Sequence, residues 1–174
     1  DRASGAQVID GSLRFLQGLQ NQSYGTYLKR TPSSDGNRRI YTFSVWCTRN
    51  QLKGMPLGNG YDASTFDLAG ANDFRIEFES SRADALNIFD DTMANNMDVT
   101  TNALYRDTNA WYHVVAAVDT TQGTAADRVK LYVNGVQQTS LATATYPTQD
   151  TQGDWNDASY VHNIGQRGTG SIWD

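Results

Sequence analysis

The stretch WYHVVAAVDTTQGTAADRVKLYVNGVQ, residues 111–137, decides the fold. Its first part, Trp111 to Val118, is largely apolar on both strand faces, which is typical of a strand in the inner part of a sheet sandwich. Residues 128–134 then alternate between apolar and polar side chains and predict a half-buried strand. Asn134-Gly135 supplies the two positive-φ residues of a type I′ turn. We therefore expect a hairpin that folds 128–133 onto 136–141.

Period-two alternation recurs along the rest of the chain. Ile40–Thr48 is β-branched and aromatic, with Tyr41, Phe43 and Val45 on one face. Phe74, Ile76 and Phe78 alternate with charged residues and predict a second clear strand. Shorter strands are expected near 12–16, 27–30, 65–68, 86–89, 97–104 and 160–165. Roughly ten short strands with turn residues between them, and no helical periodicity, predict an all-β antiparallel fold, either a sandwich or a barrel.

The length and the charge of the chain limit the classes of function that are expected. A chain of 174 residues is expected to form one domain, with 1–10 as a linker or N-terminal arm and 11–174 as the folded part. The net charge of −5 argues against nucleic-acid binding, which needs clustered Lys and Arg. No apolar run approaches the length of a membrane span, so membrane insertion is not expected. A single cysteine, Cys47, cannot form an intrachain disulfide.

No catalytic arrangement of side chains stands out. His113 and His162 are the only histidines, and neither has a second soft ligand at zinc-binding spacing. We interpret both as structural residues. No phosphate loop, dinucleotide motif or Ser-His-Asp order is present. The sequence therefore predicts that the protein is not an enzyme.

Several short motifs carry a family resemblance. Trp-x-His-Val at 111–114 is followed by VKLYVNG at 129–135 and by Ile164-Gly165, while LRF at 13–15 and YTFSVW at 41–46 match the opening strands. In this order they resemble the concanavalin A-like lectin/glucanase superfamily, in its laminin-G-like and pentraxin-like branch. The resemblance implies a jelly-roll sandwich. In such domains a further strand follows a segment like 170–174, so we expect the last strand to be missing or supplied by a neighbouring chain, and the open edge to have partners.

A narrower resemblance covers YLKRTPSSDGNRRIYTFSVWCTR, residues 27–49. This stretch is similar to laminin-G-like modules in bacteriophage virion proteins such as fibres, spikes and head appendages. The resemblance implies a non-catalytic structural or adhesion module of a virus particle: a fibre, a tail appendage or a capsid decoration protein. It also implies a location on the particle surface, other virion chains as partners, and a homo-oligomer.

The alternative is a lectin-like module that binds a host surface glycan. Trp155 stands in a polar loop beside Asp154, Asn156 and Asp157. An aromatic ring with polar neighbours can stack on a sugar or anchor an interface, or it can fold back onto its own domain. The sequence leaves these alternatives open.

The resemblance also makes calcium possible, because related domains often bind it at a rim of loops. Asp90, Asp91 and Asp119 are the candidate ligands, since they follow or end apolar strands; solvated turn residues are the alternative.

Glucanases of the superfamily carry a Glu-x-Asp-x-x-Glu strand. The corresponding residues here are Glu77, Glu79 and Arg82, so the pattern fails at the second and third places. We interpret the two glutamates as charges on the solvent face of their strand.

Overall fold

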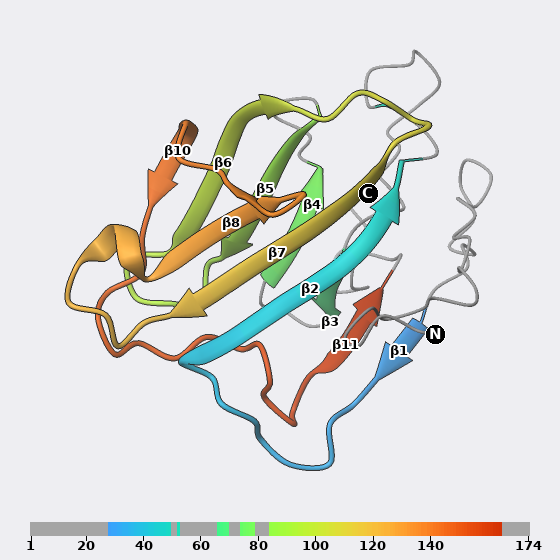
Figure 1. The fold of residues 1–174 in the computed structure, drawn as a ribbon. Helices are drawn as coiled ribbons and strands as arrows, with labels where there is room; N and C mark the ends of the chain where they lie inside the picture. Colours follow the sequence, from blue (N-terminus) through green and yellow to red (C-terminus); the bar gives the residue numbers. More distant parts are fainter. Residues whose placement is uncertain (1–27, 50–51, 53–65, 70–73, 79–83, 165–174) are drawn as a thin grey trace, which may run out of the picture.

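The protein is an antiparallel β-sandwich. The computed structural model describes residues 28–49, 52, 66–69, 74–78 and 84–164, and in them two sheets face each other (Figure 1). In spatial order the larger sheet contains β1 (Leu28–Arg30), β11 (Val161–Ile164), β3 (Phe66–Ala69), β4 (Phe74–Phe78), β5 (Ala85–Asp90), β6 (Met97–Leu104) and β10 (Leu141–Thr145). The smaller sheet contains β2 (Ile40–Thr48), β7 (Trp111–Asp119), β8 (Val129–Val133) and β9 (Val136–Gln137), with the 3₁₀ turn η1 (Ala125–Asp127) before β8. The predicted all-β sandwich is confirmed.

The core lies between the inward faces of the two sheets. From the larger sheet, Phe74, Ile76 and Phe78 of β4 are at most 3% exposed, as their alternation predicts. The smaller sheet supplies the even-numbered residues of β7 and the odd-numbered residues of β8: Tyr112, Val114, Ala116, Val118, Val129, Leu131 and Val133. Burial of these apolar side chains is the main stabilising contribution to the fold.

The Asn-Gly hairpin is confirmed, but its second strand is shorter than expected. Asn134 and Gly135 have φ values of 50° and 78°, and Val133 pairs with Val136. β9 ends after two residues instead of continuing to 141. The amide of Gln138 still donates to the carbonyl of Leu131 in β8, and beyond it the chain crosses to the larger sheet, where Ser140 O accepts a hydrogen bond from the amide of Asn102 in β6. The following strand, β10, pairs with β6.

Two expectations about exposure were wrong. The odd-numbered side of β7 is not inside the sandwich: Trp111 is 52% exposed and His113 is half-buried. Glu77 is not a solvent-facing charge, because it is only 7% exposed and its Oε1 lies 2.8 Å from Nε of Arg75. The reason is the same in both cases: alternation tells which residues share a face, not what covers that face.

A buried ion pair connects the two sheets at one end of the sandwich. Arg49 follows β2 and is 1% exposed, and its Nη1 lies 2.7 Å from Oδ1 of Asp84, just before β5. The same Nη1 donates to the carbonyl of Tyr105 at 2.6 Å, and the guanidinium lies over the ring of Phe78 at 4.7 Å. A buried charge is tolerated only with such partners. The predicted arm 1–10, the predicted strand 12–16, Glu79, Arg82 and the segment 170–174 lie outside the described residues.

Candidate functional site

The outward side of the smaller sheet carries a group of exposed aromatic rings. Trp46 on β2 is 50% exposed and Trp111 on β7 is 52% exposed. In the antiparallel register Trp46 lies opposite His113, and Thr48 lies opposite Trp111. The indole of Trp46 stacks on the imidazole of His113, with centroids 4.8 Å apart and planes 15° from parallel. We call Trp46, Trp111 and His113 the aromatic face.

Hydrogen bonds fix the position of His113 within this face. Its Nε2 lies 3.0 Å from the hydroxyl of Ser44, which is on the same side of β2 as Trp46. Its backbone amide donates to Oδ1 of Asn134 at 2.8 Å, and its carbonyl accepts from the amide of Asn134 at 2.9 Å. The hairpin turn therefore holds the end of β7 and the ring on it. A ligand that meets the aromatic face would not have to order the stack first, which lowers the entropic cost of binding.

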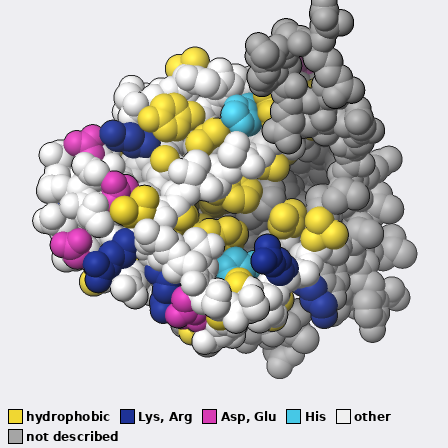
Figure 2. Space-filling view, turned by 60° about the horizontal axis from the view of Figure 1, so that its bottom comes forward, with side chains coloured by type: hydrophobic (Ala, Val, Ile, Leu, Met, Phe, Trp, Pro, Cys, Tyr) yellow, Lys and Arg dark blue, Asp and Glu magenta, His cyan; other side chains and the backbone are white. Residues whose placement is uncertain are grey.

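The charged side chains of β2, β7 and β8 lie away from the aromatic face: Lys130 lies opposite Ala117, four positions along β7 from His113, and Asp119 is six positions from His113. On β8, Nζ of Lys130 lies 3.0 Å from Oδ1 of Asp127. At the end of β7, the carboxylate of Asp119 accepts hydrogen bonds from Thr121 and from Gln122. In the space-filling view, hydrophobic side chains (yellow) and both histidines (cyan) reach the surface, with Lys and Arg (dark blue) and Asp and Glu (magenta) side chains between them (Figure 2). The separation of Lys130 and Asp119 from the aromatic face favours an uncharged polar ligand there over a strongly charged one.

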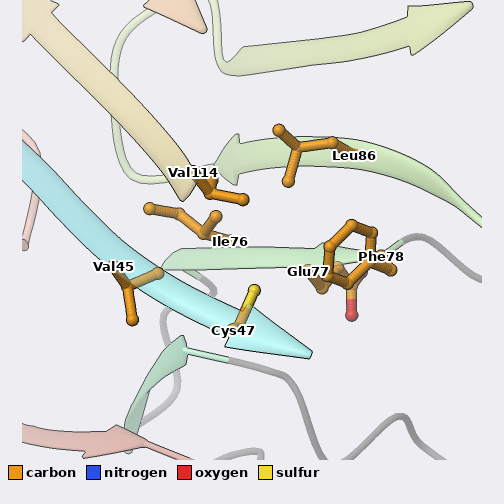
Figure 3. A pocket seen from close by; sticks show the side chains of 7 residues that line it. All are labelled: Val45, Cys47, Ile76, Glu77, Phe78, Leu86 and Val114. Atoms are coloured by element: carbon orange, nitrogen blue, oxygen red, sulfur yellow. The ribbon is translucent and has the colours of Figure 1, made fainter. Parts of the chain in front are cut away.

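The cavity found between the described strands of the two sheets is not a comparable site. A small cavity between the sheets is lined by Val45, Cys47, Ile76, Glu77, Phe78, Leu86 and Val114 (Figure 3). Its volume of about 10 Å³ has room for about one water molecule. It is therefore too small for a sugar or an organic cofactor.

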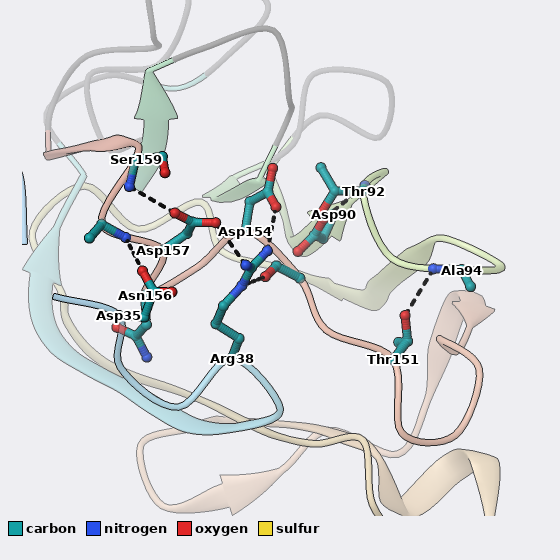
Figure 4. A network of polar contacts seen from close by, with 12 residues as sticks. Asp35, Arg38, Asp90, Thr92, Ala94, Thr151, Asp154, Asn156, Asp157 and Ser159 are labelled. Atoms are coloured by element: carbon teal, nitrogen blue, oxygen red, sulfur yellow. Dashed lines mark hydrogen bonds and ion pairs between the residues drawn. The ribbon is translucent and has the colours of Figure 1, made fainter.

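The residues predicted to bind a ligand, Asp154 to Asp157, do lie together in a loop at the rim of the sandwich (Figure 4). Their polar groups are engaged by the chain itself. Oδ1 of Asp154 lies 2.9 Å from Nη2 of Arg38, and Oδ2 of Asp157 lies 2.8 Å from Nη1 of the same guanidinium. The side-chain amide of Asn156 donates to the carbonyl of Asn37 at 3.0 Å.

Trp155 folds back onto its own domain. The half-buried indole lies 4.8 Å from the ring of Phe74 and 4.7 Å from that of His162, measured between centroids. It also lies within 6.4 Å of Tyr41 and of Phe43. This packing closes the rim of the core. Ligand binding by Trp155 and its three polar neighbours stays a prediction, and the structure assigns these residues a stabilising role as well.

The three predicted calcium ligands do not form one group. Oδ1 of Asp90 accepts from the amide and hydroxyl of Thr92, and Oδ1 of Asp119 accepts from the amide and hydroxyl of Thr121. Asp91 is exposed next to Asp90. Within the described ranges, no three Asp, Glu, His or Cys residues are placed to hold a metal ion. Asp90, Asp91 and Asp119, as the described residues place them, do not together fit a calcium site, because calcium takes six or more clustered oxygen ligands.

The aromatic face was missed in the sequence because the strand register was unknown. Trp46 and His113 are 67 positions apart, and only the pairing of β2 with β7 brings them together. The available signal was one tryptophan on each strand, Trp46 on the even-numbered side of β2 and Trp111 on the odd-numbered side of β7, and it is also what a buried strand would show.

A family model described as the concanavalin A-like lectin/glucanase superfamily, of laminin-G type, matches residues 22–173. The match covers the described part of both sheets. Comparisons with curated proteins and with solved structures gave no significant match. Among the described residues, no helix is long and apolar enough to cross a membrane. By its two-sheet architecture and by this match, the chain belongs to the concanavalin A-like lectin/glucanase superfamily.

Proposed function

We propose that this chain is a non-catalytic adhesion module that meets its ligand with the aromatic face. The observation that supports the proposal best is the stacked pair of Trp46 and His113, half-exposed beside Trp111. Large exposed rings leave apolar area in water that a ligand can cover, and tryptophan is prominent among residues that dominate binding energy. The core does not use these rings, since they point away from it.

The ligand class that suits the aromatic face is an uncharged glycan. The faces of a sugar ring carry C–H groups that pack on an indole, and its edges carry hydroxyls that need hydrogen-bond partners. Ser44 and Thr48 lie two positions on either side of Trp46 and share its side of β2. Lys130 and Asp119 lie four or more positions along β7 from His113, and this distance favours a neutral ligand at the aromatic face.

The proposal includes that the protein does not hydrolyse the glycan that it binds. A retaining glycosidase needs two approachable carboxyl groups about 5–5.5 Å apart. Glu77 is 7% exposed, and Arg75 lies against it with Nε 2.8 Å from Oε1. A carboxylate held in this way is poorly placed to protonate or attack a substrate.

The setting we propose is the surface of a virus particle, in a fibre, a tail appendage or a capsid decoration protein. The support is the resemblance of residues 27–49 to modules of bacteriophage virion proteins. Other particle chains, including copies of this one, would be its partners. Recovery of its peptides from purified particles supports this setting, and a chain that is abundant in infected cells yet missing from particles contradicts it.

Binding is tested on an array of neutral and anionic glycans. We expect Trp46→Ala and Trp111→Ala each to weaken binding by about tenfold or more, the factor that follows from losing about 1.4 kcal/mol of contact. Leu104→Ala is the matched control, because Leu104 is a 39% exposed apolar residue on β6 of the other sheet. Binding that survives both tryptophan changes, or no binding to any glycan, rules out the proposed role of the aromatic face.

A further inference from the structure

Two loop segments are tied together at the rim of the sandwich, and we call residues 35–38 and 153–158 the rim clasp (Figure 4). Arg38 contributes the ion pairs to Asp154 and Asp157, and its Nε donates to the carbonyl of Gly153 at 2.6 Å. Oδ1 of Asp35 accepts from the amide of Ala158 at 2.8 Å. These contacts span more than 110 positions in the sequence, so the clasp is a tertiary structure and not a local turn.

Asn156 makes several of the hydrogen bonds that hold the rim clasp together. Its carbonyl accepts from the amide of Gly36 at 2.8 Å, and its side-chain amide donates to the carbonyl of Asn37. Its backbone amide donates to Nε2 of His162 at 3.2 Å. Asn156 has a φ of 68°, a left-handed conformation that needs support from its surroundings. The bond to His162 is therefore one of the contacts that hold this conformation.

The partners of His162 determine its protonation state. Nδ1 lies 3.2 Å from the carbonyl of Tyr160, which can only accept, so the proton is on Nδ1. Nε2 faces the N–H of Asn156, which can only donate, so Nε2 carries no proton. The imidazole that fits the clasp is thus the neutral Nδ1–H form. Protonation would place an N–H against the amide of Asn156 and remove that hydrogen bond.

We propose that His162 makes the rim clasp proton-sensitive: the clasp is closed while the imidazole is neutral and loosens around Asn156 when the imidazole becomes charged. Loosening would also free the edge of Trp155, whose ring meets that of His162 at 4.7 Å with an angle of 66°. This inference does not depend on the aromatic face.

The surroundings of His162 place the transition below pH 6.5. Burial is the main cause of a pKa below the ordinary value of 6.5, and the cation of Arg30, which lies opposite His162 in the pairing of β1 with β11, acts in the same direction. The bond to Tyr160 and the charge of Asp157 oppose this shift. From β3 the residue opposite is Leu68, which carries no charge. The clasp is therefore expected to be closed at neutral pH.

The test follows amide hydrogen exchange of Gly36, Asn156 and Ala158 by NMR, corrected for the intrinsic effect of pH on exchange. Between about pH 7.5 and the acid end of the His162 ring titration, we expect the protection of Asn156 to fall by roughly fivefold, the factor that corresponds to one hydrogen bond of net strength about 1 kcal/mol. The ring ¹⁵N signals of the wild-type protein should show the Nδ1–H form at neutral pH and a titration midpoint below 6.5. Unchanged protection across the titration of His162 overturns the proposal, as does an Nε2–H form at neutral pH.

Two variants separate His162 from other titrating groups. In His162→Gln the amide oxygen can accept from Asn156 and does not titrate, so the clasp should stay protected at both pH values. His113→Gln removes the other histidine, which lies on the outward side of β7, and should leave the pH response of the clasp as in the wild type. A response that persists in His162→Gln overturns the proposal. If that variant does not fold, the ring ¹⁵N titration of the wild type still decides.

Discussion

Asp90 and Asp119 end two different strands with the same hydrogen bonds and have opposite pKa shifts. Each carboxylate accepts from the amide and the hydroxyl of the threonine two positions later, Thr92 at 2.9 and 2.5 Å and Thr121 at 3.1 and 2.6 Å. Asp90 is fully buried, and desolvation raises its pKa from 3.8 to about 6. Asp119 is near the surface, and its hydrogen bonds to Thr121 and Gln122 lower its pKa. Burial, and not the hydrogen bonding in the turn, decides whether the pKa of the carboxylate is raised or lowered.

The raised pKa of Asp90 predicts how the free energy of unfolding depends on pH. Because the pKa of Asp90 is higher in the folded state than in the unfolded state, the folded state holds this proton more tightly. The contribution of Asp90 to the free energy of unfolding is therefore complete below about pH 4 and is lost as the pH rises through 6. The loss amounts to about 3 kcal/mol, from a shift of roughly two pKa units. Urea unfolding as a function of pH measures it. Asp90→Asn should remove this slope, Asp119→Asn should leave it in place, and an equal slope in Asp90→Asn contradicts the assignment.

Gly153 is a glycine because Asp90 leaves no room for a side chain. A Cβ there would lie 2.4 Å from Oδ2 of Asp90 and 2.6 Å from Cε of Met93. We expect Gly153→Ala to cost about 1–3 kcal/mol of unfolding free energy through overpacking. Gly123→Ala is the control, since nothing lies within 4 Å of its Cβ position, and it should be close to neutral. Equal midpoints for the two variants in thermal unfolding contradict this packing.

Arg49 and Arg106 contact different oxygens of the same carboxylate and should differ widely in importance. The side chain of Arg49 is 0% exposed and lies 2.7 Å from Oδ1 of Asp84, whereas that of Arg106 is 60% exposed and lies 3.1 Å from Oδ2. Removing one partner of a buried pair typically costs about 3–5 kcal/mol, so Arg49→Met should destabilise the fold strongly. Arg106→Ala should cost less than about 1 kcal/mol, as exposed pairs do. Similar costs in chemical denaturation would mean that Asp84 is not buried as described.

The strands could be predicted from the sequence because their signals are local. β2 and β6 have the predicted bounds, and the turn at Asn134-Gly135 lies at the tip of the β8–β9 hairpin. The length of β9 could not be predicted, because it depends on the chain crossing to β6 at Ser140, a contact between distant residues.

The candidate site could not be predicted for a related reason. The pairing of Trp46 with His113 and the packing of Trp155 on Phe74 are tertiary contacts. For Trp155 the sequence left open a sugar-binding residue, an interface anchor and a ring folded onto its own domain, and the structure shows that the ring closes the core. Trp46 and Trp111 look like core residues of apolar strands, yet each is about half exposed.

The indole N–H signals of Trp46, Trp111 and Trp155 report directly on where a ligand binds. In an NMR titration of the ¹⁵N-labelled protein with a neutral oligosaccharide selected on the array, we predict that the signals of Trp46 and Trp111 shift together, along with the amides of β2 and β7. The signal of Trp155 should stay in place. Shifts confined to Trp155 and residues 153–158, with the aromatic face unchanged, would contradict the account.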